Sequence, residues 1–315
     1  MAKRKQVPLL ITWDVDPDRQ ATPERRQEGV SMAMDLCAKF GIRATFFITA
    51  NAVHEYPDHL QRMQDLGQEI GCHGLTHTIE EEYHRMPEAM QRAYIEEATA
   101  KLEAAAGQPV RAFRSPRVKI SATTLRLLSE YGYVVDSTVC SQRIDFVSSN
   151  LINKGWLVAP RRPYHPHRTN PYKRGDLSIW EVPVSAMVVP FISGSLNIFG
   201  LGFMKVFFRM LYAESRATGK PIVYLAHPLE FIDSGKRKSH FSRRKLRKRF
   251  SIAYIRAHGL LIRRMLYRMR GEAWFNATRE LFAYMTSFPD VAPMTSSEYA
   301  NYLENSTSAT SGGLS

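Results

Sequence analysis

Cysteine is scarce in this chain of 315 residues, which contains only Cys37, Cys72 and Cys140. An odd number of widely spaced cysteines fits neither a disulfide framework nor a CxxC zinc clamp, so we expect three buried, unpaired side chains. Long apolar runs are also absent, because no uninterrupted run reaches the roughly 18 to 20 residues that cross a bilayer. The first residues, MAKRKQVPLL, lack a signal-peptide hydrophobic region. We therefore expect a cytoplasmic protein.

Acidic residues are missing from one stretch, which has 14 Lys or Arg between Lys236 and Arg270 and no Asp or Glu. Because the whole chain carries a formal charge of +13, the rest is close to neutral. The stretch can be wound as an amphipathic helix in which four arginines recur every seven residues: Arg249, Arg256, Arg263 and Arg270. Such a helix is either a solvated face, a contact for the inner face of an anionic membrane, or a nucleic-acid-binding surface. No helix-turn-helix, zinc finger or RNA-binding aromatic motif supports nucleic-acid binding.

Helix-like stretches alternate with short apolar runs in the first 135 residues, and a glycine separates each pair: Gly41, Gly67, Gly107 and Gly132. Glycine suits the left-handed turn that ends a helix, and helices alternating with strands indicate parallel βαβ units. Further strands are predicted at 9–16, 178–185 and 221–227, which gives about seven. The count suits an α/β barrel as well as an open sheet, and in both the active site lies at the carboxyl ends of the strands.

The length and composition predict one catalytic domain with additions. We expect this domain over residues 1–235, a basic amphipathic helical insertion over 236–272, closing helices over 273–304 and a disordered tail over 305–315. The apolar segment 196–212 is interrupted by glycine and by charge, and it predicts a core helix, with a lipid groove as the alternative.

Two carboxylates end the first predicted strand, LLITWDVD. Strand alternation puts Asp14 and Asp16 on one face, where they repel each other unless a cation lies beside them. A turn capped by Asp16 would also explain the pattern. The segment GCHGLTHT then places His73 and His77 four residues apart, at the end of another strand. Together with Asp16 they form a two-histidine, one-carboxylate set, which leaves coordination positions open for water and substrate.

Three later strands also end in polar residues. Arg114 could hold a carboxylate such as Asp14 in its ionised form, although a surface arginine is the alternative. Asp136 and His227 end two further strands. An aspartate paired with a histidine orients the ring and raises its pKa, which suits a general acid; a capping Asp and a core His are the alternatives.

These motifs, in this order, resemble the polysaccharide deacetylases of the NodB-homology type. TWDVD is similar to the aspartate motif of that family, HGLTH to its paired-histidine motif, FRSP to its arginine-proline motif, VVDST to its fourth motif and YLAHP to its late histidine. The resemblance spans roughly residues 7 to 232. It implies a distorted (β/α) barrel of seven strands and a metal-dependent hydrolase that removes an N-acyl group, chiefly N-acetyl, from an amino sugar.

The resemblance also implies roles for individual residues. The metal ligands would be Asp16, His73 and His77, and the metal would be zinc, with cobalt, nickel or manganese as alternatives. Asp14 would be the general base and His227 the general acid.

The same resemblance gives each proton-transfer residue a partner, Arg114 for Asp14 and Asp136 for His227. Val15 separates the two aspartates, Pro17 follows them, and Arg117 replaces a small residue common in the family; these departures leave the sugar and its carrier open. The substrate would be a polysaccharide, a glycan precursor or a lipid-linked saccharide. A deformylase or cyclic-amide hydrolase on the same fold is the alternative, whereas a metal-free carbohydrate-binding relative is disfavoured because all the catalytic positions are present.

Overall fold

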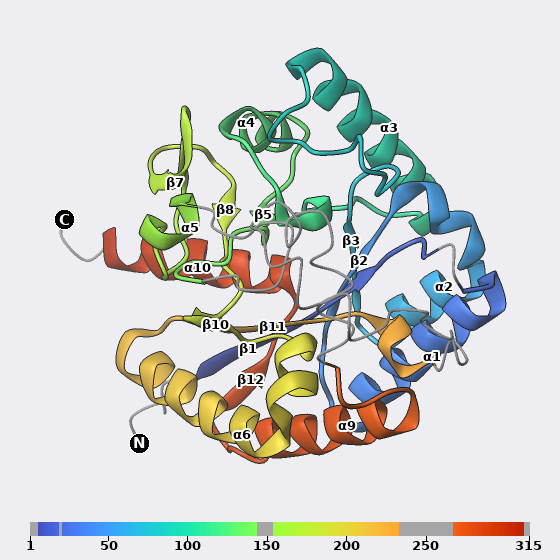
Figure 1. Cartoon of the computed structure of the whole chain (residues 1–315). Coiled ribbons are helices and arrows are strands. Elements are labelled where there is room, and N and C mark those ends of the chain that lie inside the picture. The colour runs from blue at the N-terminus through green and yellow to red at the C-terminus, as the bar shows by residue number, and fades with distance from the viewer. Residues whose placement is uncertain (1–5, 19–20, 144–153, 233–266, 312–315) are drawn as a thin grey trace, which may run out of the picture.

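The computed structural model describes residues 6–18, 21–143, 154–232 and 267–311. Its centre is a curled parallel sheet with helices packed around the outside (Figure 1). Seven strands follow one another in hydrogen-bonded order: β11 (Ile222–Ala226), β1 (Val7–Val15), β2 (Thr45–Ile48), β3 (Glu69–Cys72), β4 (Ala112–Phe113), β5 (Val135–Asp136) and β8 (Trp180–Glu181). They correspond to the seven predicted strands, so the predicted α/β fold is confirmed.

In the described part of the chain, seven helices of nine or more residues lie between these strands or after them: α1 (Pro23–Lys39), α2 (Pro57–Asp65), α3 (Glu88–Ala106), α4 (Ala122–Glu130), α6 (Ser193–Thr218), α9 (Glu272–Thr286) and α10 (Ser296–Ser311). The four glycines expected to end helices all have left-handed backbones, with φ between 61° at Gly41 and 79° at Gly132. Only glycine adopts this conformation without a steric cost, so these positions turn the chain from each helix into the next strand.

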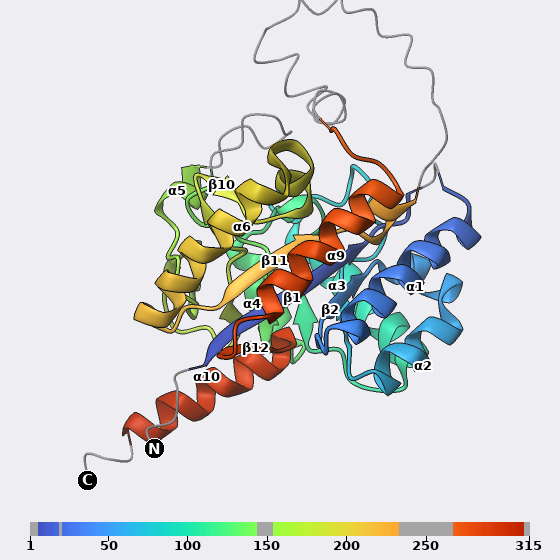
Figure 2. The same cartoon turned by 90° about the horizontal axis from the view of Figure 1, so that it is seen from below.

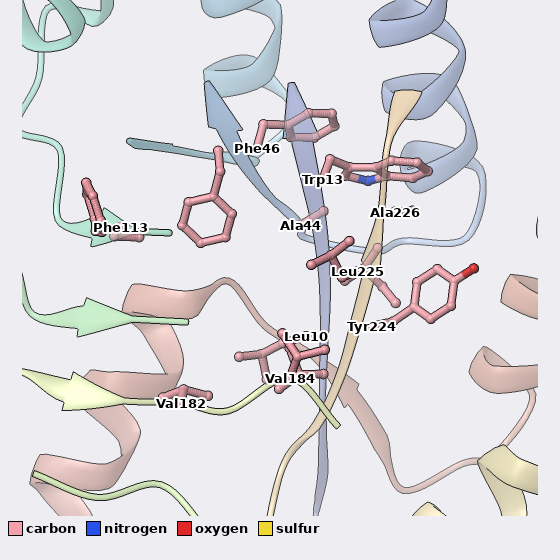
Figure 3. Close-up of a cluster of buried hydrophobic side chains, with 14 of the residues drawn as sticks. Leu10, Trp13, Ala44, Phe46, Phe113, Val182, Val184, Tyr224, Leu225 and Ala226 are labelled. Atoms are coloured by element: carbon pink, nitrogen blue, oxygen red, sulfur yellow. The ribbon is translucent and has the colours of Figure 1, made fainter. Parts of the chain in front are cut away.

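Strand β1 occupies the middle of the sheet, hydrogen-bonded to β11 on one side and to β2 on the other. All nine of its residues are buried, as expected for a continuous apolar run in a parallel sheet covered on both faces. Trp13 stacks on Phe46 with ring centroids 6.1 Å apart and meets Phe282 of α9 edge-on at 6.0 Å. Figure 3 shows part of this core. The three cysteines are buried and free, as predicted.

The two ends of the seven-strand order approach each other. After β8 the chain reaches Ser185, whose N–H donates to Val223 O at 3.2 Å, and Val223 N–H donates back to Ser185 Oγ at 3.0 Å. Ile192 also bridges Leu225 in parallel. These contacts lead from β8 to β11, so the sheet is a distorted barrel rather than an open sheet.

Several short strands were not predicted. β12 (Val291–Pro293) pairs in parallel with β1. Two antiparallel hairpins lie outside the main sheet: β6 (Pro166–His167) with β7 (Asn170–Arg174), and β9 (Ala186–Met187) with β10 (Val189–Pro190). All of these strands except β7 have two or three residues, too few for an apolar pattern to stand out in the sequence.

The carboxyl-terminal region differs in part from the prediction. Helix α10 (Ser296–Ser311) includes residues 305–311, so the predicted disordered tail does not begin at 305. No glycine or proline stops the helix before Gly312, which explains why it continues. Residues 312–315 lie outside the described residues. Most of the predicted basic insertion, residues 236–266, also lies outside the described residues. Its last predicted residue, Glu272, is the first residue of α9.

Candidate metal centre

The predicted site residues lie at the carboxyl ends of neighbouring strands. Asp14 and Asp16 are at the end of β1, His73 directly follows β3, and His227 directly follows β11. Because these strands are parallel and close in the sheet, their carboxyl ends meet at one rim, although the residues are far apart in sequence.

Three of these residues form a cluster that could hold a metal ion. The ligand atoms of Asp16, His73 and His77 all lie within 4.8 Å of one another. Asp16 Oδ1 is 3.3 Å from His73 Nε2 and 3.4 Å from His77 Nε2. Two ligands that lie about 2.0 to 2.1 Å from one zinc ion at the tetrahedral angle are about 3.3 Å apart, so these separations fit a shared metal.

The surroundings of the cluster also fit a cation. Asp16 Oδ1 is buried and has no hydrogen-bond partner, and a buried carboxylate oxygen in that state is costly unless it meets a positive charge. His73 Nδ1–H donates to Arg114 O at 2.8 Å, which leaves the Nε2 lone pair turned toward Asp16. This arrangement sets the tautomer that a metal ligand requires. Two imidazoles and one carboxylate suit zinc and other divalent transition metals.

The loop that carries His77 is held by Glu81, a residue that was not among the predicted site residues. The buried carboxylate of Glu81 accepts hydrogen bonds from the N–H groups of Leu75 at 2.7 Å, Thr76 at 2.7 Å and His77 at 2.6 Å. It also accepts from Thr76 Oγ1 at 2.9 Å and Tyr83 OH at 3.0 Å. His77 has a left-handed backbone with φ 56°, which is strained for a residue with a Cβ. Glu81 therefore fixes the strained turn that presents the His77 ring.

Asp14 lies beside the cluster and is bound to Arg114. The fully buried guanidinium donates to Asp14 Oδ1 at 2.8 Å, to Thr12 Oγ1 at 2.8 Å, and to the carbonyl and hydroxyl oxygens of Ser137 at 2.7 and 2.9 Å. It also lies over the Phe47 ring, 4.4 Å from the centroid. A guanidinium held at so many points cannot swing away from its carboxylate.

The second carboxylate oxygen of Asp14 faces the metal cluster. Its Oδ2 lies 3.9 Å from His73 Nε2, on the side of the metal cluster. The sequence motif paired Asp14 with Arg114, and the structure brings these two side chains together.

The structure gives Asp136 partners other than His227, with which the resemblance paired it. Asp136 is fully buried, and it accepts hydrogen bonds from the N–H and Oγ1 of Thr138, at 3.2 and 2.7 Å. It faces Glu181, and burial raises the pKa of both carboxyls. The Asp136 carboxylate is turned toward Thr138 and Glu181, and these contacts occupy it.

His227 is instead partnered by Glu230. Its Nδ1 lies 3.3 Å from Glu230 Oε1, because the 3₁₀ turn η3 (Pro228–Phe231) folds the chain back within three residues. His227 Nε2 lies 3.9 Å from Asp16 Oδ2, on the side of the cluster. A carboxylate three residues after the histidine, in AHPLE, was the signal available in the sequence.

The two charged groups that face each other here shift each other's protonation. Burial acts to lower the pKa of His227, but the hydrogen bond and charge of Glu230, with the charges of Asp16 and Asp14, raise it to about 9. Burial acts to raise the pKa of Asp16, but its interactions with the neighbouring His77, His73 and His227 rings outweigh it and lower the pKa. In the metal-free protein His227 therefore keeps its proton at neutral pH and Asp16 stays ionised.

The predicted arginine stripe cannot be placed as a whole. Arg249, Arg256 and Arg263 lie outside the described residues, whereas Arg270 is exposed immediately before α9.

Comparisons with known proteins agree with the resemblance of the motifs. Residues 2–135 match a family model described as polysaccharide deacetylase. A bifunctional xylanase/deacetylase of Pseudobutyrivibrio xylanivorans is 27% identical over 128 residues, which cover 38% of this chain and 21% of the relative. A peptidoglycan deacetylase-like protein of Gibberella zeae is 25% identical over 113 residues, covering 35% of this chain and 32% of the relative. The match thus spans less than a third of either relative.

Solved structures share the fold over nearly the whole chain. A Mycobacterium smegmatis structure assigned as a polysaccharide deacetylase has a TM-score of 0.64 at 19% identity and covers 98% of this chain and 93% of its own. A Pseudomonas aeruginosa structure with the same assignment has a TM-score of 0.58 at 15% identity, with coverage of 95% and 91%. An allantoinase structure has a TM-score of 0.59 at 16% identity, with coverage of 96% and 91%. At these identities the likeness shows the fold alone.

Proposed function

We propose that this chain, whose residues 2–135 match a family model described as polysaccharide deacetylase, is a member of that family and a metal-dependent hydrolase that removes an N-acetyl group from an amino sugar. The observation that carries the proposal is the cluster of Asp16, His73 and His77, with Asp14 and His227 beside it. The three ligands supply a metal site with open positions, and the two other residues can move protons.

The chemistry is amide hydrolysis. A divalent metal held by the three ligands would polarise the amide carbonyl and lower the pKa of a water molecule from about 16 toward 7. Asp14 accepts the proton of the attacking water through Oδ2, since Arg114 holds Oδ1. His227 donates a proton to the nitrogen as the carbon–nitrogen bond breaks.

The surroundings of His227 support its role as the acid. A pKa raised to about 9 keeps the ring protonated at neutral pH in the metal-free protein, so a proton is available for the leaving amine. Glu230 binds Nδ1 and thereby turns Nε2 toward the cluster. Because the donor and the acceptor of protons come from two adjacent strands, β11 and β1, their separation is set by the sheet and not by a loop.

The proposed substrate class is an amino-sugar-containing glycan, either polymeric or carried by a lipid. The names of the two relatives, a xylanase/deacetylase and a peptidoglycan deacetylase-like protein, support a glycan with acetylated groups. The fold alone does not select the bond, because an allantoinase has the same fold. Release of formate, or opening of a cyclic amide, is therefore the competing outcome.

The test combines metal analysis with product assays on the purified chain. We expect one divalent ion per chain, zinc or otherwise cobalt, nickel or manganese, and release of acetate from polymeric, nucleotide-linked or lipid-linked N-acetyl sugars. Asp14→Asn should lower kcat by about 10² to 10⁴ with unchanged metal content, as for the loss of a general base. Asp58→Asn on the exposed side of α2 is the matched control and should leave kcat unchanged. Normal turnover by Asp14→Asn would refute the role of Asp14 as the general base. Release of formate without acetate would show that the enzyme removes a formyl and not an acetyl group.

A further inference from the structure

The exposed face of helix α6 is apolar to an unusual degree. Four large hydrophobic side chains on it are exposed: Phe199 (47%), Phe203 (40%), Val206 (61%) and Met210 (53%). They follow one another at spacings of four, three and four residues, so they form one stripe along the helix. Phe199 and Phe203 touch, with ring centroids 4.8 Å apart, even though Gly200 interrupts the helical backbone between them. A helix whose outer face only meets water usually carries polar residues there, and a contiguous exposed apolar stripe marks a site of interaction.

The opposite face of α6 is firmly packed. Met204, Phe207, Phe208 and Leu211 are buried, and the helix packs against α9, β11 and β1. Figures 1 and 2 both show α6 beside α9 on the outside of the sheet. By length and composition α6 could cross a membrane, and 33% of its most apolar window is buried in the fold. The buried part is the face that packs on the barrel. Since crossing would tear this packed face from the barrel, the exposed face can meet lipid only from the side.

The charge of α6 is entirely positive along the stripe. From Ser193 to Ala213 the helix contains Lys205 and Arg209 and no Asp or Glu. Arg209 is exposed beside Met210. Cations beside an apolar stripe are the arrangement of helices that lie in the interface of an anionic bilayer, where the apolar side chains enter the acyl boundary and the cations meet phosphate groups.

The most cationic part of the sequence joins the fold next to this helix. The described chain resumes at Tyr267, and Asn197 in the first turns of α6 holds it there. Asn197 Oδ1 accepts from Arg268 N at 2.6 Å and Met269 N at 3.1 Å, and Asn197 Nδ2 donates to Met269 O at 2.9 Å. The sequence that leads into this contact, from Lys236 on, has no acidic residue. The positive charge of this sequence is complementary to an anionic surface. Because α6 also carries positive charge, the same sequence is a poor candidate to cover the apolar stripe itself.

We propose that the exposed face of α6 is a docking surface for an anionic lipid bilayer, with the helix axis in the plane of the interface. The surface consists of Phe199, Phe203, Val206 and Met210, with Arg209 on its flank. A second copy of the chain fits less well, because two such faces would bring cations of like charge together. The inference does not depend on the proposed hydrolase activity, since it concerns a face that carries none of the proposed catalytic residues.

The test is partitioning of the purified full chain onto vesicles of equal parts phosphatidylglycerol and phosphatidylcholine, compared with vesicles of phosphatidylcholine alone. We expect binding to the anionic vesicles at low salt that weakens as salt is raised. Met210→Asp should lower the partition constant by about tenfold or more, because burial of a side chain of this size is worth at least that factor. Arg209→Gln should lower it about fivefold and should flatten the salt dependence.

A matched control is available in α3, where Met90 is also an exposed helical methionine (39%). Met90→Asp adds the same charge away from α6 and should leave partitioning close to that of the parent chain. Both variants should keep the parent's thermal unfolding midpoint, because both positions are exposed. The proposal is overturned if the parent does not bind anionic vesicles at low salt, or if Met210→Asp binds as the parent does. It is also overturned if Met90→Asp loses as much binding, or if light scattering shows that Met210→Asp only dissociates a dimer that does not bind vesicles.

Discussion

Replacement of Glu81 by glutamine tests whether its carboxylate fixes residues 75–77, the loop that presents the His77 ring. The side chain keeps its shape, but one carboxylate oxygen becomes an NH₂ group, which can donate but cannot accept. In the structure Oε2 of Glu81 accepts three hydrogen bonds, from Thr76 N, Thr76 Oγ1 and His77 N. Oε1 accepts two, from Leu75 N and from a tyrosine hydroxyl. The amide nitrogen therefore takes the Oε1 position, where fewer donors oppose it.

The size of the effect follows from this choice. The hydroxyl of Tyr83 can turn and accept from the new NH₂ group, but the N–H of Leu75 is left buried without an acceptor. A buried donor without a partner costs about 1 to 3 kcal/mol, and the remaining bonds lose their charge assistance. For Glu81→Gln we expect a loss of about 2 to 3 kcal/mol from the free energy of unfolding, which lowers the unfolding midpoint of a chain of this size by about 3 to 5 °C.

The more specific consequence is for the metal. If the grip of Glu81 keeps His77 at its left-handed φ, its loss should weaken zinc affinity by about 10 to 100-fold, as is usual when a group that orients a ligand is removed. Competition with a chromophoric chelator measures this affinity.

Glu82→Gln provides the control. Glu82 is the next residue and is also buried, but it pairs with Lys119, Arg117 and Arg85 and not with the loop at Leu75 to His77. Wild-type zinc affinity in Glu81→Gln, or an equal loss in Glu82→Gln, would show that the loop does not depend on this carboxylate.

Other predictions test the same centre. Gly74→Ala should destabilise the fold by about 2 kcal/mol or more and weaken zinc binding, because φ is 73° and a Cβ would lie 2.5 Å from Glu81 Oε1 and 2.7 Å from Pro116 Cγ; a thermal melt and the chelator assay measure both, and an unchanged midpoint would contradict the structure. In the metal-free chain the raised pKa of His227 contributes stability that is full below pH 6.5 and is lost as the pH rises through about 9. Glu230→Gln should reduce that loss in melts taken across this range, and an identical pH profile would exclude Glu230 as the cause. Removal of the metal by a chelator should abolish acetate release, zinc should restore it, and activity that survives exhaustive chelation would contradict a metal-dependent reaction.

The positions of Asp14, Asp16, His73 and His77 could be predicted because each follows a strand that is visible as an apolar run. Parallel strands bring their carboxyl ends to one rim, so order along the chain is enough to collect such residues. The pairing of side chains within the rim was harder. Asp136 also ends a predicted strand, but its carboxylate meets Thr138 and Glu181, and no single motif shows which neighbour a side chain at a strand end will contact.

The supporting carboxylates could not be recognised from the sequence for a related reason. Glu81 and Glu230 act through loop geometry: a turn of left-handed residues in one case and a short 3₁₀ turn in the other. Acidic residues in loops are common, and only the backbone directions show which of them face N–H groups or an imidazole. Strand β12 was not predicted because three residues are too few to show the alternation of apolar and polar residues that marks a strand.

The place of β1 between β11 and β2 has a consequence for how the protein folds. β1 is synthesised before the other strands of its sheet, yet one of its hydrogen-bonding edges has no partner until β11 is made, since Leu9 pairs with Ile222 more than two hundred residues later. Until then that edge of a strand that is fully buried in the finished fold is open to any other extended chain. A fragment limited to residues 2–135 contains the segment that matches the family but lacks β8 and β11. We therefore expect such a fragment to aggregate rather than to fold, so the unit that can be inherited, truncated or fused is larger than the segment of recognisable sequence.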